Sequence, residues 1–259
     1  MKYIRGAHRP LASLALACAT LLGATWAPPA HALRPHDGTD ADVAEPGALQ
    51  IEAGVGRIRQ GTDRSFYAPD FAATFGLDGD TEVALGGRLT RQLGDSAGPY
   101  RTSLSDTELA VKHLLRKGSL QDGGSGLSVA LECALALPEV HGEHGYGGGC
   151  TTAVSNRWDA LTLHLNGGLA RTRVHTTVRT LGLIAEGPDD WTLRPALELV
   201  AERETGGGWS NSALIGATYK VSDELSFDAG VRHARTGDGS LNELRLGLTW
   251  NLRWKNAKD

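Results

Sequence analysis

The chain has few residues whose types and spacing could do chemistry, and a pair of cysteines is the first candidate. Cys133 and Cys150 lie on either side of a glycine-rich stretch centred near Gly142. If 125–137 and 147–155 pair as antiparallel strands around that stretch, counting back from the loop places the two cysteines directly opposite each other. Opposed strand residues lie close enough to be bonded, so this register predicts a disulfide, with two separate thiols as the alternative.

A second cluster has the donor types of a metal site. His141, Glu143, His144 and Cys150 lie within one short stretch. Structural zinc needs rigid, tetrahedral placement of its ligands, and a glycine-rich loop does not provide it. We therefore expect chance clustering here, and we predict neither a metal nor another cofactor.

A hydrolase of the lipase type is a third possibility. It needs a serine, a histidine and an orienting amide or acid within reach of one another. His164 and Asn166 share one strand face, but no serine sits beside them in the pattern, and Ser128 lies on a strand that is near in order without being a neighbour. Asp228 and His175, imagined as a protease pair, have no specific spacing either. We therefore expect no enzymatic activity.

Charged residues recur in a more regular way, on one face of amphipathic segments. In 225–232, for example, leucine, phenylalanine, alanine and valine alternate with serine, aspartate, glycine and arginine. A period of two predicts β-strands. In a membrane barrel the polar face lines the lumen and the apolar face meets lipid. We therefore predict ten lumen-facing residues: Glu52, Arg88, Lys112, Glu132, His164, Asn166, Glu198, Asp228, Arg232 and Arg245.

These inward charges have two interpretations. They could line a narrow pore and set its charge preference. They could equally pair with one another and plug the barrel, because charges in a confined space must be paired or solvated.

The elements that position these residues are about a dozen strands, with turn clusters between them. An even number of strands places both chain ends in the periplasm, as in bacterial single-chain barrels. Short turns alternate with longer loops, which fits periplasmic turns and external loops. The predicted fold is an all-β, antiparallel, up-and-down transmembrane β-barrel with strands at about 48–59, 65–77, 80–93, 105–117, 125–137, 147–155, 158–171, 178–187, 190–204, 211–221, 224–235 and 241–254.

The amino-terminal segment has the anatomy of a secretory signal peptide. A positive region with Lys2, Arg5 and Arg9 precedes an apolar core over 11–23, and the small-x-small site ends at Ala32. Lipoprotein processing at Cys18 is the less favoured alternative, since the residue three positions earlier is alanine. The predicted organisation is a signal peptide (1–32), a flexible periplasmic lead-in (33–46), the barrel (47–254) and a periplasmic tail (255–259).

Composition fits this organisation. The mean hydropathy is −0.23, so the chain is hydrophilic on average, as a barrel is when only every second strand residue meets lipid. Removing Lys2, Arg5 and Arg9 from the 26 basic residues leaves 23 against 30 acidic ones, a net charge of −7. No basic stripe is visible, which argues against a nucleic-acid partner.

Several strand patterns occur in a familiar order: 127–138 (LSVALECALALP), 161–168 (LTLHLNGG), 193–204, 222–231 (SDELSFDAGV) and 246–254 (LGLTWNLRW). In this order they resemble the outer-membrane barrel family described as the MetA-pathway-of-phenol-degradation, or transporter-like, type. The resemblance spans roughly 47–254 and rests on soft motifs. It implies a barrel of about a dozen strands and passage of small hydrophobic or aromatic molecules, and it brings no catalytic residues.

The chain departs from that family at two places. Glu139-Val140 stands where a small polar pair is common, and the chain ends Lys255 to Asp259 instead of on an aromatic residue. The second departure implies that the assembly machinery recognises an internal pattern ending at Trp254.

The sequence therefore predicts a monomeric outer-membrane barrel of a Gram-negative bacterium, a passive channel or uptake protein for small molecules. Its expected partners are outer-membrane lipid, the barrel-assembly machinery and a solute that the sequence does not name. A non-transporting structural or loop-mediated binding barrel is the main alternative, and an outer-membrane hydrolase is the third.

Overall fold

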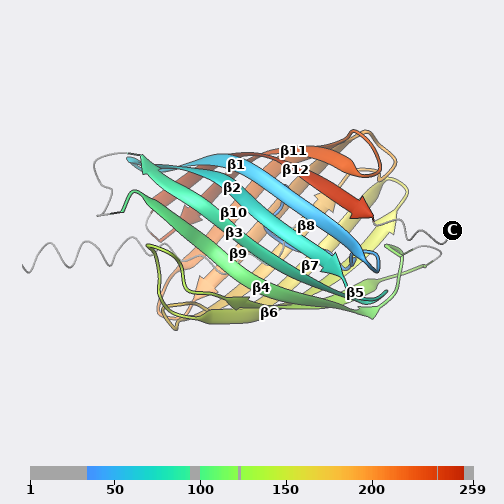
Figure 1. Ribbon diagram of the computed structural model, residues 1–259, viewed down its shortest axis with the longest axis horizontal. Coiled ribbons are helices and arrows are strands. Elements are labelled where there is room, and N and C mark those ends of the chain that lie inside the picture. Colours follow the sequence, from blue (N-terminus) through green and yellow to red (C-terminus); the bar gives the residue numbers. More distant parts are fainter. Residues whose placement is uncertain (1–33, 94–99, 122–123, 238, 254–259) are drawn as a thin grey trace, which may run out of the picture.

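The computed structural model describes residues 34–93, 100–121, 124–237 and 239–253, and there the chain forms a closed antiparallel barrel (Figure 1). Each strand pairs with its neighbours in sequence, and β1 closes the barrel against β12. The strands are β1 (Ala48–Gln60), β2 (Asp63–Gly76), β3 (Thr81–Leu93), β4 (Thr102–Arg116), β5 (Ser128–Ala136), β6 (Gly147–Trp158), β7 (Leu161–Arg171), β8 (Thr177–Glu186), β9 (Leu193–Glu204), β10 (Trp209–Lys220), β11 (Leu225–Thr236) and β12 (Gly239–Arg253).

The predicted fold class is thereby confirmed. All twelve strands occur, and every described boundary lies within three residues of its predicted position. The period of two explains this accuracy, because a strand with one polar and one apolar face shows both faces in its sequence. The predicted signal peptide and the predicted tail lie outside the described residues.

The connections differ from the predicted alternation of short and long. β1 and β2 are joined by the short turn 61–62, at the end of the barrel where longer loops were expected. Residues 117–127 join β4 to β5 at the opposite end, which carries Ala48 and Arg253 and is called here the terminal end. The other end is called the far end.

The outer face of the barrel is apolar. Leu165, Leu181, Ile215 and Val231 are 56%, 62%, 69% and 59% exposed. Proteins in water rarely expose so large an apolar surface. This belt matches the lipid-facing band of a membrane barrel. None of the described residues forms a helix long and apolar enough to cross a membrane.

Among the described strands, bulges interrupt the four ladders from β1 to β5 and no others. One lies between Tyr67 and Asp70 of β2. An extra residue changes the phase of a strand and re-aims its side chains. Here it lets both residues point inward: Tyr67 is fully buried and donates its hydroxyl hydrogen to Glu243 at 2.6 Å, while Asp70 binds Arg88.

Candidate functional site

The ten residues predicted to face the lumen all lie on the inner face. Nine of them are buried and Arg232 is half-buried, whereas most of the leucines and valines next to them in sequence are exposed to the outside. Their role in lining a pore stays a prediction. In the structure, most of them contact a segment that precedes the first strand and that the strand pattern did not predict to lie in the lumen.

That segment is residues 34–46, called here the lumen segment. It lies inside the barrel and reaches β1 at the terminal end, where Gly47 donates its backbone N–H to the carbonyl of Gly76 at 2.8 Å. The prediction of a flexible periplasmic lead-in is therefore wrong about the place of these residues. Their polar groups, which suggested a solvated segment, are satisfied instead by the charged wall of the lumen.

Arg34 occupies a binding site made by four strands. Its guanidinium contacts Asp70 at 3.1 Å and Asp228 at 3.2 Å. It lies over Gly54 and Gly247, which face each other in the β1–β12 ladder. A Cβ atom at either glycine would come within 2.2 Å of the guanidinium, so a larger residue would displace Arg34 from this position. Pro35 lies in the same way against a second opposed pair, Gly216 of β10 and Gly230 of β11.

Asp37 is the most heavily bound residue of the lumen segment. Its carboxylate contacts Arg232 at 2.6 Å and Arg245 at 2.7 Å. Although burial opposes it, the positive charge of these two guanidiniums holds the pKa of Asp37 well below its usual range. The backbone N–H groups of Asp37 and Gly38 both donate to Glu198, at 3.0 and 2.7 Å. Three charged wall residues thus bind two consecutive residues of the segment.

The next residues continue this pattern toward the terminal end. Asn166 makes a two-way contact with the backbone of Thr39: its oxygen accepts from the N–H at 2.7 Å, and its amide donates to the carbonyl at 2.8 Å. The Thr39 hydroxyl donates to Glu132 at 3.1 Å. Asp40 pairs with Lys112 at 3.3 Å. These contacts are directional, so they define one position for the segment.

One group of side chains has the composition of a catalytic triad. The Ser155 hydroxyl lies 2.8 Å from Nδ1 of His164, whose Nε2 lies 3.1 Å from Glu186. Sequence reasoning considered Ser128 and missed Ser155, which is the register partner of His164 on β6. Ser155 is 0% exposed and accepts the backbone N–H of Ala41 at 3.0 Å. With the lumen segment in place, no substrate carbonyl can reach this hydroxyl.

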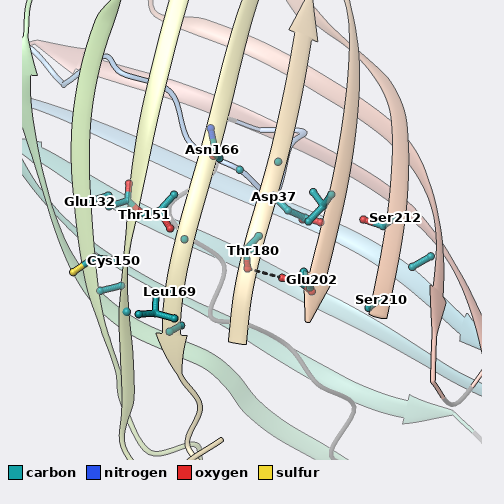
Figure 2. Close-up of a pocket in the computed structure, with 18 of the residues that line it drawn as sticks. Asp37, Glu132, Cys150, Thr151, Asn166, Leu169, Thr180, Glu202, Ser210 and Ser212 are labelled. Atoms are coloured by element: carbon teal, nitrogen blue, oxygen red, sulfur yellow. Dashed lines mark hydrogen bonds between the residues drawn. The ribbon is translucent and has the colours of Figure 1, made fainter. Parts of the chain in front are cut away.

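Two cavities flank the lumen segment. The larger, of about 100 Å³, extends from Asp37 and Gly38 toward the far end (Figure 2). Figure 2 shows that Thr151, Thr180, Glu202, Ser210 and Ser212 line it together with small residues of β5–β11. The smaller, of about 70 Å³, lies on the other side, between the segment and β1–β4, and is lined largely by charged residues that include Arg88 and Asp106.

The two cysteines lie outside the lumen, near the far end of β5 and β6. They are register partners, and the structure joins them by a disulfide with an S–S distance of 2.11 Å. No group of three or more metal-donor side chains occurs in the described part of the chain. Of the histidines considered for a metal site, His141 stacks instead on the Tyr100 ring, with centroids 4.0 Å apart.

The architecture has clear relatives among solved structures. The COG4313 outer membrane channel from Pseudomonas putida F1 superposes with a TM-score of 0.62 at 10% identity, over 84% of this chain and 100% of that one. The KdgM porin in complex with disordered oligogalacturonate superposes with a TM-score of 0.56 at 9% identity, over 79% of this chain and 99% of that one.

The sequence comparisons found nothing further: no family model matches the chain, and no curated protein matches it. Membership of the MetA-pathway type therefore stays a prediction. At such low identity the structural matches establish architecture alone, and the chain has the fold of outer-membrane channel barrels.

Proposed function

We propose that the protein is a passive channel of the bacterial outer membrane for small solutes, and that its own lumen segment narrows the passage. The observation that carries this proposal is the arrangement along the lumen. A cavity lined mainly by hydroxyl groups, alanine and glycine extends toward the far end, and the lumen segment ends it at Asp37 and Gly38. A passage that ends on a separate chain segment fits a channel with an internal constriction.

The size of the larger cavity supports a narrowed state. About 100 Å³ is small beside the roughly 300–1,000 Å³ typical of pockets for small ligands. Passage of a solute therefore requires the lumen segment to shift or to leave. Most of its contacts are hydrogen bonds and ion pairs, which water can replace. Among the described residues, the buried apolar cluster that it joins is the small one of Ala41 with Ala130 and Ala153.

The chemistry of the solute follows from the wall. No aromatic side chain lines the larger cavity among the described residues, and carboxylates and one guanidinium do. This wall, which is apolar over most of its area and carries polar groups between its apolar ones, favours small amphiphilic solutes. The preference for hydrophobic or aromatic molecules implied by the family resemblance stays a prediction, as do the monomeric state and recognition by the assembly machinery.

The proposal can be tested by fixing the lumen segment to the wall. A Cβ atom built at Gly230 lies 3.4 Å from Cβ of Pro35, close to the separation of about 3.5–4.5 Å in disulfides. The double variant Pro35→Cys with Gly230→Cys should therefore cross-link the segment to β11. In planar bilayers we expect rare openings while the cross-link is intact and frequent openings, in discrete steps, after reduction.

The wild-type protein treated with the same reductant is the control, because reduction also opens the Cys133–Cys150 disulfide. A folded and inserted protein that stays electrically silent both before and after reduction, in the variant and in the wild type, would overturn the channel proposal. Such a result would favour the non-transporting barrel.

A further inference from the structure

The outer face of the far end carries a dense group of arginines. Four belong to β1–β3 and three to β7–β9, and all seven are exposed on outward-facing strand positions within a few residues of the strand ends. They form two groups, called here the β1–β3 cluster (Arg57, Arg59, Arg64 and Arg91) and the β7–β9 cluster (Arg171, Arg179 and Arg203).

Within each cluster two arginines face each other directly across a ladder. Arg59 of β1 is the partner of Arg64 of β2, and Arg179 of β8 is the partner of Arg203 of β9. Like charges in directly opposed positions destabilise a sheet. Arg171 adds a third charge diagonally across from Arg179. Such an arrangement is favourable only if anions lie between the guanidiniums.

The described part of the chain does not supply those anions. None of the seven arginines forms an ion pair with a carboxylate of the described residues, whereas three cations at the terminal end do. There Lys117 pairs with Asp80 at 2.7 Å, Arg157 with Asp189 at 3.1 Å and Lys220 with Asp223 at 2.9 Å. Among the described residues, exposed cations without a carboxylate partner are therefore concentrated at the far end, although Arg116 at the terminal end is another.

The choice of cation and its surroundings indicate the kind of ligand. Both clusters consist of arginine, and the described lysines lie in the lumen or near the terminal end. Arginine binds phosphate through two parallel hydrogen bonds, while lysine acts as a point charge. Leu181 follows Arg179 on the same outer face of β8, one position farther from the far end, and is 62% exposed. Leu169 has the same relation to Arg171 on β7 and is 57% exposed. A ligand that fits both the arginines and the leucines has phosphate groups at the far end of the barrel and acyl chains beside the apolar belt.

We propose that the two arginine clusters bind the phosphate groups of an acylated, phosphorylated glycolipid in the outer leaflet, with its acyl chains against the apolar belt. The proposal rests on the membrane placement of the barrel but not on conduction through it. Trp209, whose ring lies 5.7 Å from the guanidinium carbon of Arg203, marks the interfacial depth at which the headgroup lies. The lipid neutralises the opposed arginines, which otherwise repel each other.

The test compares two double variants that change charge equally at the two ends. Arg179→Gln with Arg203→Gln disrupts the β7–β9 cluster, and Arg157→Gln with Lys220→Gln removes two paired cations at the terminal end. Each refolded protein in detergent is titrated with diphosphorylated lipid A, with its dephosphorylated form and with inorganic phosphate, and binding is followed by native mass spectrometry. Because the β1–β3 cluster is intact in the first variant, we expect that variant to bind one molecule of diphosphorylated lipid A fewer than the wild type, and the second to bind as the wild type does.

A thermal melt keeps the result interpretable if one variant folds poorly. Without lipid A, the Arg179→Gln and Arg203→Gln variant should melt at or above the wild-type temperature, because a repulsive pair has been removed. With lipid A, the wild type should gain more than the variant. Equal binding by wild type and both variants, or equal binding of the dephosphorylated lipid, would overturn the proposal. Binding of inorganic phosphate as tight as that of lipid A would also overturn it, since the site would then recognise a free anion. Electrical silence of the protein would leave these outcomes unchanged.

Discussion

The two halves of the lumen are built from different residues, although the same strands run through both. The half toward the terminal end has charged walls, opposed glycine pairs and the lumen segment. The half toward the far end has walls of serine, threonine, alanine and glycine around the larger cavity, while on its β4–β5 side the buried Arg173 binds Glu139 at 3.5 Å. The barrel is therefore a docking surface for its own chain in one half and an open passage in the other.

This contrast shows what the inward charges do. A charged lumen can be a selective pore or a salt-bridged plug, and the sequence leaves the two equally open. In the structure, Arg34, Asp37 and Asp40 of the lumen segment bind wall residues of opposite sign. The network thus joins wall residues to one another, as in Lys112 with Glu82 and Arg245 with Glu243, and also joins the wall to the segment. Substitutions in the docking half should change how often the channel opens, and substitutions in the open half should change how much current each opening carries.

The largest expected effect follows loss of Asp37. Asp37→Ala removes contacts with Arg232 and Arg245 and leaves the strands unchanged. We expect at least a tenfold rise in open occupancy, the ratio of open to closed time of the channel. This rise is equivalent to a loss of about 1.4 kcal/mol of docking free energy. Single-channel recording measures it, with Glu202→Gln as control because Glu202 lines the cavity and accepts a hydrogen bond from Thr180 of the wall. Wild-type occupancy in Asp37→Ala would show that the segment does not limit conduction.

A smaller effect of the same kind is expected at the glycines under Arg34. In Gly247→Ala the new methyl group would lie 2.2 Å from the Arg34 guanidinium, so the side chain must move away from Asp228. Open occupancy should rise severalfold. Gly167→Ala is the matched control. It makes the same substitution in a barrel strand, at a position where nothing lies within 4 Å of the new Cβ atom. If both variants open equally often, the glycine pair has no part in docking.

The open half should respond in the opposite way. Ser212→Phe places a ring in the larger cavity, so the current of each opening should fall by roughly half while open occupancy stays at the wild-type value. Asn211→Phe, on the adjacent exposed position of β10, should change neither quantity. A change in occupancy with unchanged current in Ser212→Phe would contradict the division of the lumen into two halves.

The sequence predicts the strands and inward faces well, because each strand records its own two faces locally. It does not predict the lumen segment, since an acidic, proline-containing stretch has the composition of a solvated tail. Its partners lie on many strands, so only the three-dimensional register brings Asn166 to Thr39 and Ser155 to His164. One signal was available: glycines at inward positions on neighbouring strands, such as Gly216 and Gly230, leave space that no strand side chain fills. The pairing of Cys133 with Cys150 could be predicted because their strands are consecutive, so the register follows from counting residues back from the loop that joins them.

The smallest expected effect is a pH dependence at the base of the lumen segment. Burial, with the nearby Asp40 carboxylate adding to it, raises the pKa of Asp42 to about 6, against an ordinary value of 3.8. The docked segment therefore holds a proton that the released segment gives up, so docking weakens as pH rises from about 4 through about 6. Asp37 and Asp40 have lowered pKa values, so their contribution to docking is complete over this range and is lost only at lower pH.

Asp42→Asn removes this titration and keeps an oxygen to accept from Gln121, which lies 3.2 Å away. We expect the variant to open a few-fold less often than the wild type at about pH 7, and equally often at about pH 4.5. Lys112, Asp40 and the lumen histidines His36 and His164 also face this region, so the difference between variant and wild type isolates Asp42 from them. Parallel pH profiles for the two proteins would mean that Asp42 is ionised alike in the docked and released segment, and that its burial in the docking half has no effect on opening.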